Sequence, residues 1–269
     1  MNTANPGGSQ PRQSRRWAVK ICVVIPVLHS EELVTKAVGE YTRAAASGTE
    51  LTFTALDVGT HTIESEFDIV LNQPATLRAV QKAEADGSQA AILACFGDPA
   101  GAAAKEVSSI PIVGEGEAAL HYASLLANRF GIITVREQTI PFMFNAARRA
   151  GLEGKLASVR AVDFGVLDFS LDCVDDVVAQ AVNLVRLDGA EAIAMGCTGV
   201  GVDMCLTVTE RLQAELGSYV PVIDPVKAAI GLAESLVRSG YRQSERTYPK
   251  PPSTRPEYRW YDTEAAAHA

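Results

Sequence analysis

The chain has 269 residues, of which 47% are hydrophobic and 21% are charged, and its formal net charge is −8. This ordinary composition and length suit one large domain or two lobes of roughly a hundred residues each. The acidic balance argues against a nucleic-acid partner, for which a basic face is expected. No apolar run is long enough to span a bilayer, which argues against a membrane partner.

The first residues of the chain and its cysteines indicate the cellular compartment of the protein. Residues 1–17 are rich in Gly, Pro, Ser, Gln and Arg without an apolar core, so we expect a disordered tail and not a secretory signal. Five widely spaced cysteines without a CxxC pair fit neither a disulfide framework nor a zinc site. We therefore expect no metal and a reducing compartment, the cytoplasm.

Apolar runs rich in Val and Ile alternate along the chain with segments of helical pattern. The expected strands cover 19–26, 51–56, 90–95, 111–113, 130–135, 157–162, 192–196 and 221–223. The expected helices cover 31–46, 75–85, 101–107, 118–127, 140–150, 174–187, 204–216 and 226–238. This alternation, with continuous apolar strands, predicts parallel sheets covered by helices on both faces. After residue 240 the pattern stops, and a proline-rich extension follows.

The second half of the chain repeats the first. Residues 86–97 align without gaps with 188–199, and Asp, Gly, Ala, Cys and a final Gly recur in register. Two further pairs of segments recur in the same order. Ala55-Leu56-Asp57-Val58-Gly59 resembles Ala161-Val162-Asp163-Phe164-Gly165, and Ile110-Pro111-Ile112-Val113 resembles Val220-Pro221-Val222-Ile223. Three blocks in one order indicate a fold built twice.

Cys95 and Cys197 occupy the same place in the two copies, at the carboxyl end of a strand, where parallel sheets bind ligands. Facing lobes would present the two thiols to opposite faces of one molecule, one as base and the other as acid. We expect the two sulfurs to lie about 6–7 Å apart. The other cysteines, Cys22, Cys173 and Cys205, lack this arrangement and are predicted to be structural.

The residues after each cysteine offer backbone N–H groups at a helix start. Those of Phe96, Gly97, Thr198 and Gly199 would hold a carboxylate or an enolate. The partial positive charge of these N–H groups would also lower the cysteine pKa from its usual value of about 8.5. The Thr198 hydroxyl would lie beside the second thiol, a place also compatible with a helix cap. Asp98 is interpreted as the N-cap of the next helix, with a direct catalytic role as the alternative.

At these residues the sequence resembles the aspartate/glutamate/hydantoin racemase superfamily. Ala94-Cys95-Phe96-Gly97-Asp98-Pro99 and Gly196-Cys197-Thr198-Gly199 are similar to the two cysteine motifs of its hydantoin racemase branch, and segments 111–119 and 221–224 also fit it. The resemblance extends from about residue 19 to 240. It implies cofactor-independent racemisation by Cys95 and Cys197, in a cleft between two pseudo-symmetric α/β lobes, each a mainly parallel sheet flanked by helices.

The resemblance also implies that the lobes exchange chain and that the protein is a homo-oligomer. The expected division is a tail at 1–17, a first lobe at 18–113 plus 221–241, a second lobe at 114–220, and an extension at 242–269. The glycine-rich turn after 111–113 lacks a nucleotide-binding pattern. Gly114 in this turn is placed among the substrate-binding residues.

One motif departs from the family. Hydantoin and allantoin racemases usually carry Asn-Pro-Asn-Ser/Thr after the first strand, whereas this chain has Ile25-Pro26-Val27-Leu28-His29-Ser30. His29 either takes over a hydrogen bond to the substrate or is a loop histidine beside Ser30, the N-cap of the following helix. The departure leaves the reaction class unchanged and bears on the choice of substrate.

The predicted activity is racemisation of a small molecule, a 5-substituted hydantoin or a related ureide such as allantoin. Alternatives within the superfamily are an amino-acid racemase of the aspartate/glutamate type and a maleate-isomerase-like enzyme. Arylmalonate decarboxylases typically keep one of the two cysteines, so the presence of both argues against that activity. From another class, a non-catalytic two-lobed binding protein would explain the repeat but not the matched thiols.

Overall fold

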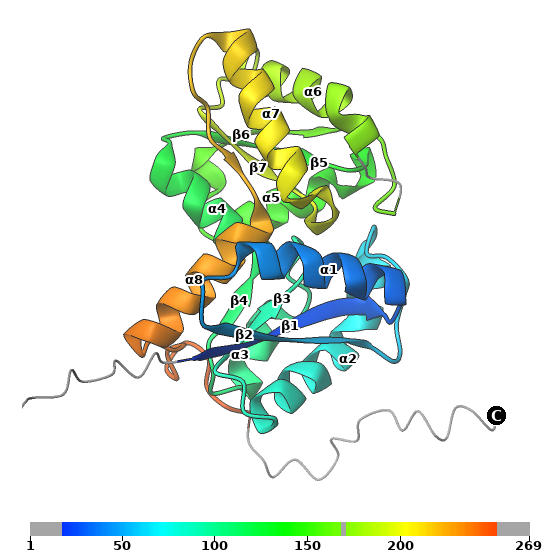
Figure 1. Cartoon of the computed structure of the whole chain (residues 1–269), viewed down its shortest axis with the longest axis vertical. Coiled ribbons are helices and arrows are strands. Elements are labelled where there is room, and N and C mark those ends of the chain that lie inside the picture. Colours follow the sequence, from blue (N-terminus) through cyan, green and yellow to red (C-terminus); the bar gives the residue numbers. More distant parts are fainter. Residues whose placement is uncertain (1–17, 168–170, 252–269) are drawn as a thin grey trace, which may run out of the picture.

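The computed structural model describes residues 18–167 and 171–251 (Figure 1). The predicted tail, residues 1–17, and residues 252–269 of the predicted extension lie outside the described residues. Within the part of the chain that the structure describes, no helix is both long and apolar enough to cross a membrane. The chain forms two lobes, stacked one above the other in Figure 1.

The first lobe contains a parallel sheet of four strands in the order β2-β1-β3-β4. Its strands are β1 (Val19–Leu28), β2 (Thr49–Leu56), β3 (Ala90–Leu93) and β4 (Ile112–Gly114). β1 pairs with β2 on one side and with β3 on the other. Because helices cover both faces of this sheet, β1 is buried along most of its length, which explains its continuous apolar sequence.

The second lobe repeats this topology with the order β6-β5-β7-β8, again all parallel. Its strands are β5 (Phe130–Thr134), β6 (Leu156–Ala161), β7 (Ala192–Met195) and β8 (Val222–Ile223). The sequence repeat therefore corresponds to one fold built twice, and the predicted α/β class with two parallel sheets is confirmed. Every predicted strand is present, with its ends within two residues of the prediction.

The helices follow the predicted order. They are α1 (Glu31–Ala44), α2 (Glu66–Ala85), α3 (Gly101–Val107), α4 (Glu115–Leu126), α5 (Ile140–Arg149), α6 (Val174–Arg186), α7 (Gly201–Leu216) and α8 (Pro225–Ser239). Short 3₁₀ turns are η1 (Glu137–Thr139), η2 (Glu153–Lys155), η3 (Leu171–Cys173) and η4 (Thr198–Val200).

The predicted start of α2 at residue 75 is wrong, because the helix begins nine residues earlier and contains Pro74. Ser65 is its N-cap, and the Ser65 hydroxyl oxygen accepts the N–H of Asp68 at 3.1 Å. The Asp68 carboxylate in turn accepts from the Ser65 hydroxyl and from the N–H of Glu64. This reciprocal cap stabilises the first turns and outweighs the one backbone hydrogen bond that Pro74 removes.

The two lobes exchange helices. α4 follows β4 of the first sheet but packs against β7 and β8 of the second, whereas α8 follows β8 and packs against β1, β3 and β4. The two exchanged helices also contact each other between the lobes (Figure 1). β8 pairs with β7, so residues 222–223 belong to the second sheet, while α8 covers the first. The predicted lobe boundaries remain a prediction.

The core has three parts. One outer cluster lies between the first sheet and α2 and α3, and another lies between the second sheet and α6 and α7. The third and largest cluster runs from the inner face of one sheet to that of the other through α1, α4, α5 and α8. Because this inner core is continuous, the exchanged helices hold the carboxyl ends of both sheets at a defined separation.

Candidate active site

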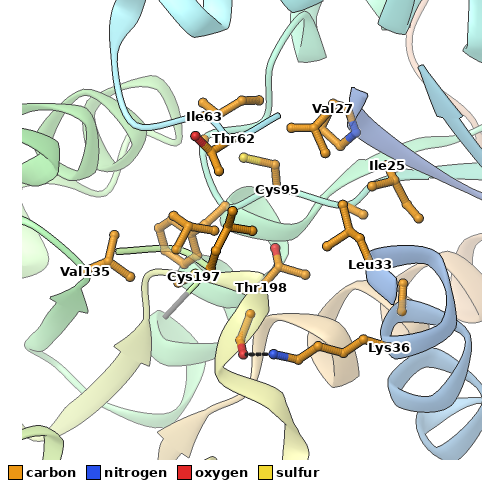
Figure 2. Close-up of a pocket in the computed structure, with 18 of the residues that line it drawn as sticks. Ile25, Val27, Leu33, Lys36, Thr62, Ile63, Cys95, Val135, Cys197 and Thr198 are labelled. Carbon is orange, nitrogen blue, oxygen red and sulfur yellow. Dashed lines mark hydrogen bonds between the residues drawn. The ribbon is translucent and has the colours of Figure 1, made fainter. Parts of the chain in front are cut away.

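Two cysteines from matching loops of the two lobes line one cavity of about 670 Å³. Cys95 lies two residues beyond β3 and Cys197 two residues beyond β7, each at the carboxyl end of its strand. Cys95 is half-buried and Cys197 is buried, and both are free thiols. Figure 2 shows both cysteines among the residues that line the cavity. No disulfide therefore competes with proton chemistry at either sulfur.

Both lobes contribute to the cavity wall, and most of the side chains that they contribute are apolar. The first lobe supplies apolar side chains from β1, α1, α2 and the loop before α2, and the second supplies others from α5 and the loops after β5 and β6. These apolar residues are Ile25, Val27, Leu28, Leu33, Ile63, Ile69, Val135, Phe142, Met143, Val166 and Leu167. Lys36 is the one lysine or arginine in the wall, counted over the described residues (Figure 2).

The structure places four of the predicted binding residues around the thiols. Phe96, Gly97, Thr198 and Gly199 all line the cavity. The N–H of Gly97 donates a hydrogen bond to the sulfur of Cys95, and in the other lobe the N–H of Gly199 donates one to Cys197. The two loops therefore present their thiols in the same way, as expected for copies of one turn.

Two other predicted binding residues do not line the cavity. His29 is exposed, and its backbone N–H donates to the carbonyl of Leu56 at 2.9 Å. Ser30 is the N-cap of α1, although its side chain makes no capping hydrogen bond. Gly114 is buried at the end of β4, where a Cβ would stand 2.2 Å from the carboxyl carbon of Asp98. Gly114 thus leaves room for Asp98 instead of facing the cavity.

Burial dominates the ionisation of both thiols. The predicted lowering of the cysteine pKa is wrong, because desolvation raises the pKa of Cys197 from 9.0 to about 11, and desolvation together with the charges of Glu115, Asp98 and Cys197 raises that of Cys95 still further. The hydrogen bonds from Gly97 and Gly199 lower both values without cancelling the burial. Lys36, whose Nζ donates to the Gly199 carbonyl at 3.0 Å, also lowers the pKa of Cys197. Cys197 is thus the more easily ionised thiol.

Asp98 caps a different helix from the one predicted. The N-cap position of α3 is held by Ala100, without a side-chain capping bond. The carboxylate of Asp98 instead accepts the N–H of Gly116 at 3.0 Å and that of Glu117 at 2.7 Å, in the first turn of α4. Local spacing favoured α3, but the return of the chain through β4 brings the open N–H groups of α4 to the loop of Cys95. Burial raises the pKa of Asp98 to about 7.

Sequence reasoning missed a buried carboxyl behind the cavity. The Glu115 side chain is fully buried at the start of α4 and accepts hydrogen bonds from the hydroxyls of Tyr41 and Thr198. Burial raises the pKa of Glu115 from 4.5 to about 8, although these two hydrogen bonds oppose the shift. An acidic residue between two glycines at the end of a strand was the available signal, since glycines there indicate close packing of the backbone.

Polar contacts also join the lobes at the cavity rim. Arg136 of the second lobe pairs with Glu64 of the first at 3.1 Å, and Glu64 also accepts the N–H of Val166 at 3.1 Å. On another side, Arg149 of α5 donates to the Gly97 carbonyl at 3.1 Å. These contacts connect segments too distant in sequence for a local pattern to predict them.

The Asp/Glu/hydantoin racemase family model matches residues 21–233, which include both cysteine loops and both sheets. The chain belongs to the Asp/Glu/hydantoin racemase family. A hydantoin racemase of Paenarthrobacter aurescens is 35% identical over 239 residues, covering 87% of this chain and 98% of that protein. The racemase class, an isomerase, is therefore established for this chain, and the predicted family is confirmed.

Solved structures of family members share the fold closely. An allantoin racemase from Klebsiella pneumoniae is 30% identical with a TM-score of 0.77, covering 87% of this chain and 94% of that one. An allantoin racemase from Pseudomonas fluorescens is 31% identical with a TM-score of 0.77, covering 90% of this chain and 100% of that one. This racemase thus has relatives named for two different substrates, and its own cavity has to indicate the choice between them.

Proposed function

We propose that this racemase inverts the carbon next to a carbonyl in 5-substituted hydantoins or a related ureide, with Cys95 and Cys197 as the acid–base pair. The observation that carries the proposal is the presence of two free thiols, from equivalent loops of opposite lobes, in the wall of one cavity. Racemisation requires a base on one face of the carbon and an acid on the other, and the two thiols supply both.

Each turnover moves two protons. The thiolate takes the proton from the carbon, and the electron pair of the broken C–H bond passes into the neighbouring carbonyl to give an enolate. The opposite thiol then gives its proton to the other face of the carbon, and the enolate returns its electrons. The thiol and thiolate have exchanged roles at the end, so the enzyme in this protonation state accepts the product enantiomer, and proton exchange with solvent returns it to its starting state. The N–H groups that follow each cysteine are suited to stabilise the enolate.

In the proposed mechanism the resting thiolate is Cys197. Its pKa is raised less than that of Cys95, and Lys36 beside Gly199 favours its charged form. The two thiols also interact, because a charged Cys197 contributes to the raised pKa of Cys95. The pair therefore holds one negative charge at a time, as an acid–base couple requires. A desolvated thiolate is also a stronger base than a hydrated one.

The cavity wall supports a hydantoin with an apolar 5-substituent. Ile25-Pro26-Val27-Leu28 stands where the family motif has the polar Asn-Pro-Asn-Ser/Thr, and Ile25, Val27 and Leu28 all line the cavity. An apolar wall stabilises an apolar substituent by about 25 cal/mol per Å² of buried surface, whereas a polar ureido group of allantoin placed against these three side chains would lose its hydrogen bonds to water. An acidic amino acid, the alternative substrate, would need cations for its carboxylates, whereas the described part of the wall holds one lysine, Lys36, and one histidine, His61, beside acidic side chains.

The test is racemisation of enantiopure hydantoins in D₂O, followed by polarimetry and proton NMR. Wild-type enzyme should abolish optical rotation and exchange the 5-hydrogen for deuterium, and both Cys95→Ser and Cys197→Ser should lose racemisation. Cys22→Ser is the matched control, because Cys22 is buried in β1 within an outer core cluster. Retained racemisation in either active-site variant would overturn the two-thiol mechanism. Activity on aspartate or glutamate, but on no hydantoin, would overturn the substrate.

We also propose that the enzyme is cytoplasmic and forms a homo-oligomer. The free thiols of Cys95 and Cys197 are compatible with a reducing compartment. Phe67, Val70 and Leu71 lie on one face of α2 with their side chains exposed, which supports burial of this face against a second copy. Light scattering of the purified protein, with Val70→Glu as the interface variant, tests the assembly, and a monomeric wild type would contradict it.

A further inference from the structure

The first turn of α4 contacts both thiol-bearing loops. On one side, Asp98 from the loop of Cys95 accepts the N–H groups of Gly116 and Glu117 at 3.0 and 2.7 Å. On the other side, the Glu115 carboxylate accepts the hydroxyl of Thr198, the residue that follows Cys197. This single turn, in the segment where the chain crosses from one lobe to the other, therefore links the two catalytic loops directly.

The glycines on either side of Glu115 allow the loop of Cys95 to lie directly on this turn. A Cβ on Gly116 would stand 2.0 Å from the carbonyl oxygen of Phe96, and a Cβ on Gly114 would overlap the carboxyl group of Asp98. Backbone and carboxyl groups thus occupy the space where side chains would be. Glu115, between these glycines, reaches the other loop instead.

We propose that Glu115 is a positioning residue for the racemase: it aligns the turn of Cys197 with the loop of Cys95 and places one ionisable charge behind both thiols. This inference rests on the proposed two-thiol mechanism. Glu115 does not line the cavity itself, so it acts through Thr198 and through its field, without touching the substrate. Tyr41 of α1 donates a second hydrogen bond to the same carboxylate and holds its orientation.

The charge of Glu115 affects the ionisation of several groups around it. The ionisable groups that face it come from α1, the two cysteine loops and the N-cap of α8: Tyr41, Cys95, Asp98, Cys197 and Asp224. The carboxylates among these groups raise the pKa of Glu115, and a charged Glu115 raises the pKa of both cysteines. Because the thiols titrate above the pH at which Glu115 ionises, each must form its thiolate against this buried negative charge.

Two substitutions separate alignment from charge. Glu115→Ala removes both hydrogen bonds to the carboxylate, and kcat should fall about 100-fold through misplacement of Cys197, with a smaller change in KM. Glu115→Gln keeps a hydrogen-bonding group of the same shape without the charge. It should recover most of kcat while moving the pH–rate profile about one unit to lower pH. Glu234→Gln is the matched control, because Glu234 is buried and accepts from Thr49 and Ala46 away from the cavity.

A readout independent of the substrate is alkylation of the thiols by iodoacetamide between pH 8 and pH 10, followed residue by residue by mass spectrometry. Glu115→Gln should speed alkylation of Cys95 and Cys197 about three- to tenfold, since more thiolate forms while each thiolate becomes less nucleophilic. Unchanged alkylation and an unchanged pH profile in Glu115→Gln would overturn the inference, as would an equal shift in Glu234→Gln. A wild type inactive on every hydantoin would instead overturn the proposed function, while the alkylation rates would still test the effect of the Glu115 charge on the two thiols.

Discussion

Gly116 is the position where the smallest substitution should disturb catalysis most. A Cβ at this residue would stand 2.0 Å from the carbonyl oxygen of Phe96, which is backbone and cannot rotate away. The loop that carries Cys95 therefore has to move by more than about 1 Å to reach ordinary van der Waals separation. In Gly116→Ala we expect kcat to fall about 100-fold, because a displacement of this size misaligns the thiol with the carbon it serves.

The loss of stability in Gly116→Ala should be modest by comparison. Overpacking of this kind costs about 1–3 kcal/mol, which lowers the melting temperature by about 2–4 °C for each kcal/mol in a chain of this size. Gly39→Ala is the matched control, because Gly39 is an exposed residue of α1 with no atom within 4 Å of its Cβ position. That substitution should raise stability by up to about 1 kcal/mol and leave kcat unchanged.

The assay combines steady-state racemisation with thermal unfolding of both variants. A Gly116→Ala enzyme that keeps the wild-type kcat would refute the reasoning, because the loop of Cys95 would then tolerate displacement. A Gly116→Ala protein that stays folded at the assay temperature but has lost kcat would support the reasoning, since the loop would then have moved without unfolding of the protein.

Three further predictions concern charge and the cavity rim. In Lys36→Met the pKa of Cys197 should rise, because Lys36 lowers it in the wild type. The pH–rate profile should then move to higher pH, with about threefold lower activity at pH 8. An unchanged profile would contradict this role of Lys36. In Arg136→Met the ion pair to Glu64 is lost, and KM should rise about threefold with little change in kcat; a change confined to kcat would contradict it. The third prediction concerns stability: burial raises the pKa of Glu115 from 4.5 to about 8, so over this interval the folded protein holds a proton that the unfolded chain releases. The wild-type free energy of unfolding should therefore fall as the pH rises from about 4.5 to about 8, by on the order of 4 kcal/mol relative to Glu115→Gln, as measured by urea denaturation; parallel pH dependences would contradict the buried charge.

Local pattern was sufficient for the elements of the fold. Each strand is a short apolar run bounded by turn residues, and the strands were predicted to within two residues. Helix starts were predicted less well, because they depend on caps: α2 begins at Glu66, after a reciprocal cap between Ser65 and Asp68, and continues through Pro74. Proline appears as a boundary in a sequence, whereas its cost of one hydrogen bond is small beside a well-made cap.

The site divides in the same way. Cys95 and Cys197 were identified from the sequence because a repeat places equivalent residues at equivalent strand ends, and parallel strands put those ends on the same edge of each sheet. The roles of Asp98 and Glu115 were not accessible, since their partners lie 18 or more residues away and meet only after α4 crosses between the lobes. The exposed position of His29 likewise follows from the path of the loop after β1.

The sequence by itself determined the repeated α/β fold, the racemase family and the two candidate thiols, because period, turn chemistry and repeated residues are local properties of a chain. Only the tertiary structure decided the electrostatics of the site. Backbone amides lower the pKa of a thiol, as the motif suggested. Burial of Cys197 between the two lobes removes water, however, and raises the pKa of this thiol to about 11. Desolvation depends on everything that surrounds a group, and that surrounding exists only once the chain has folded.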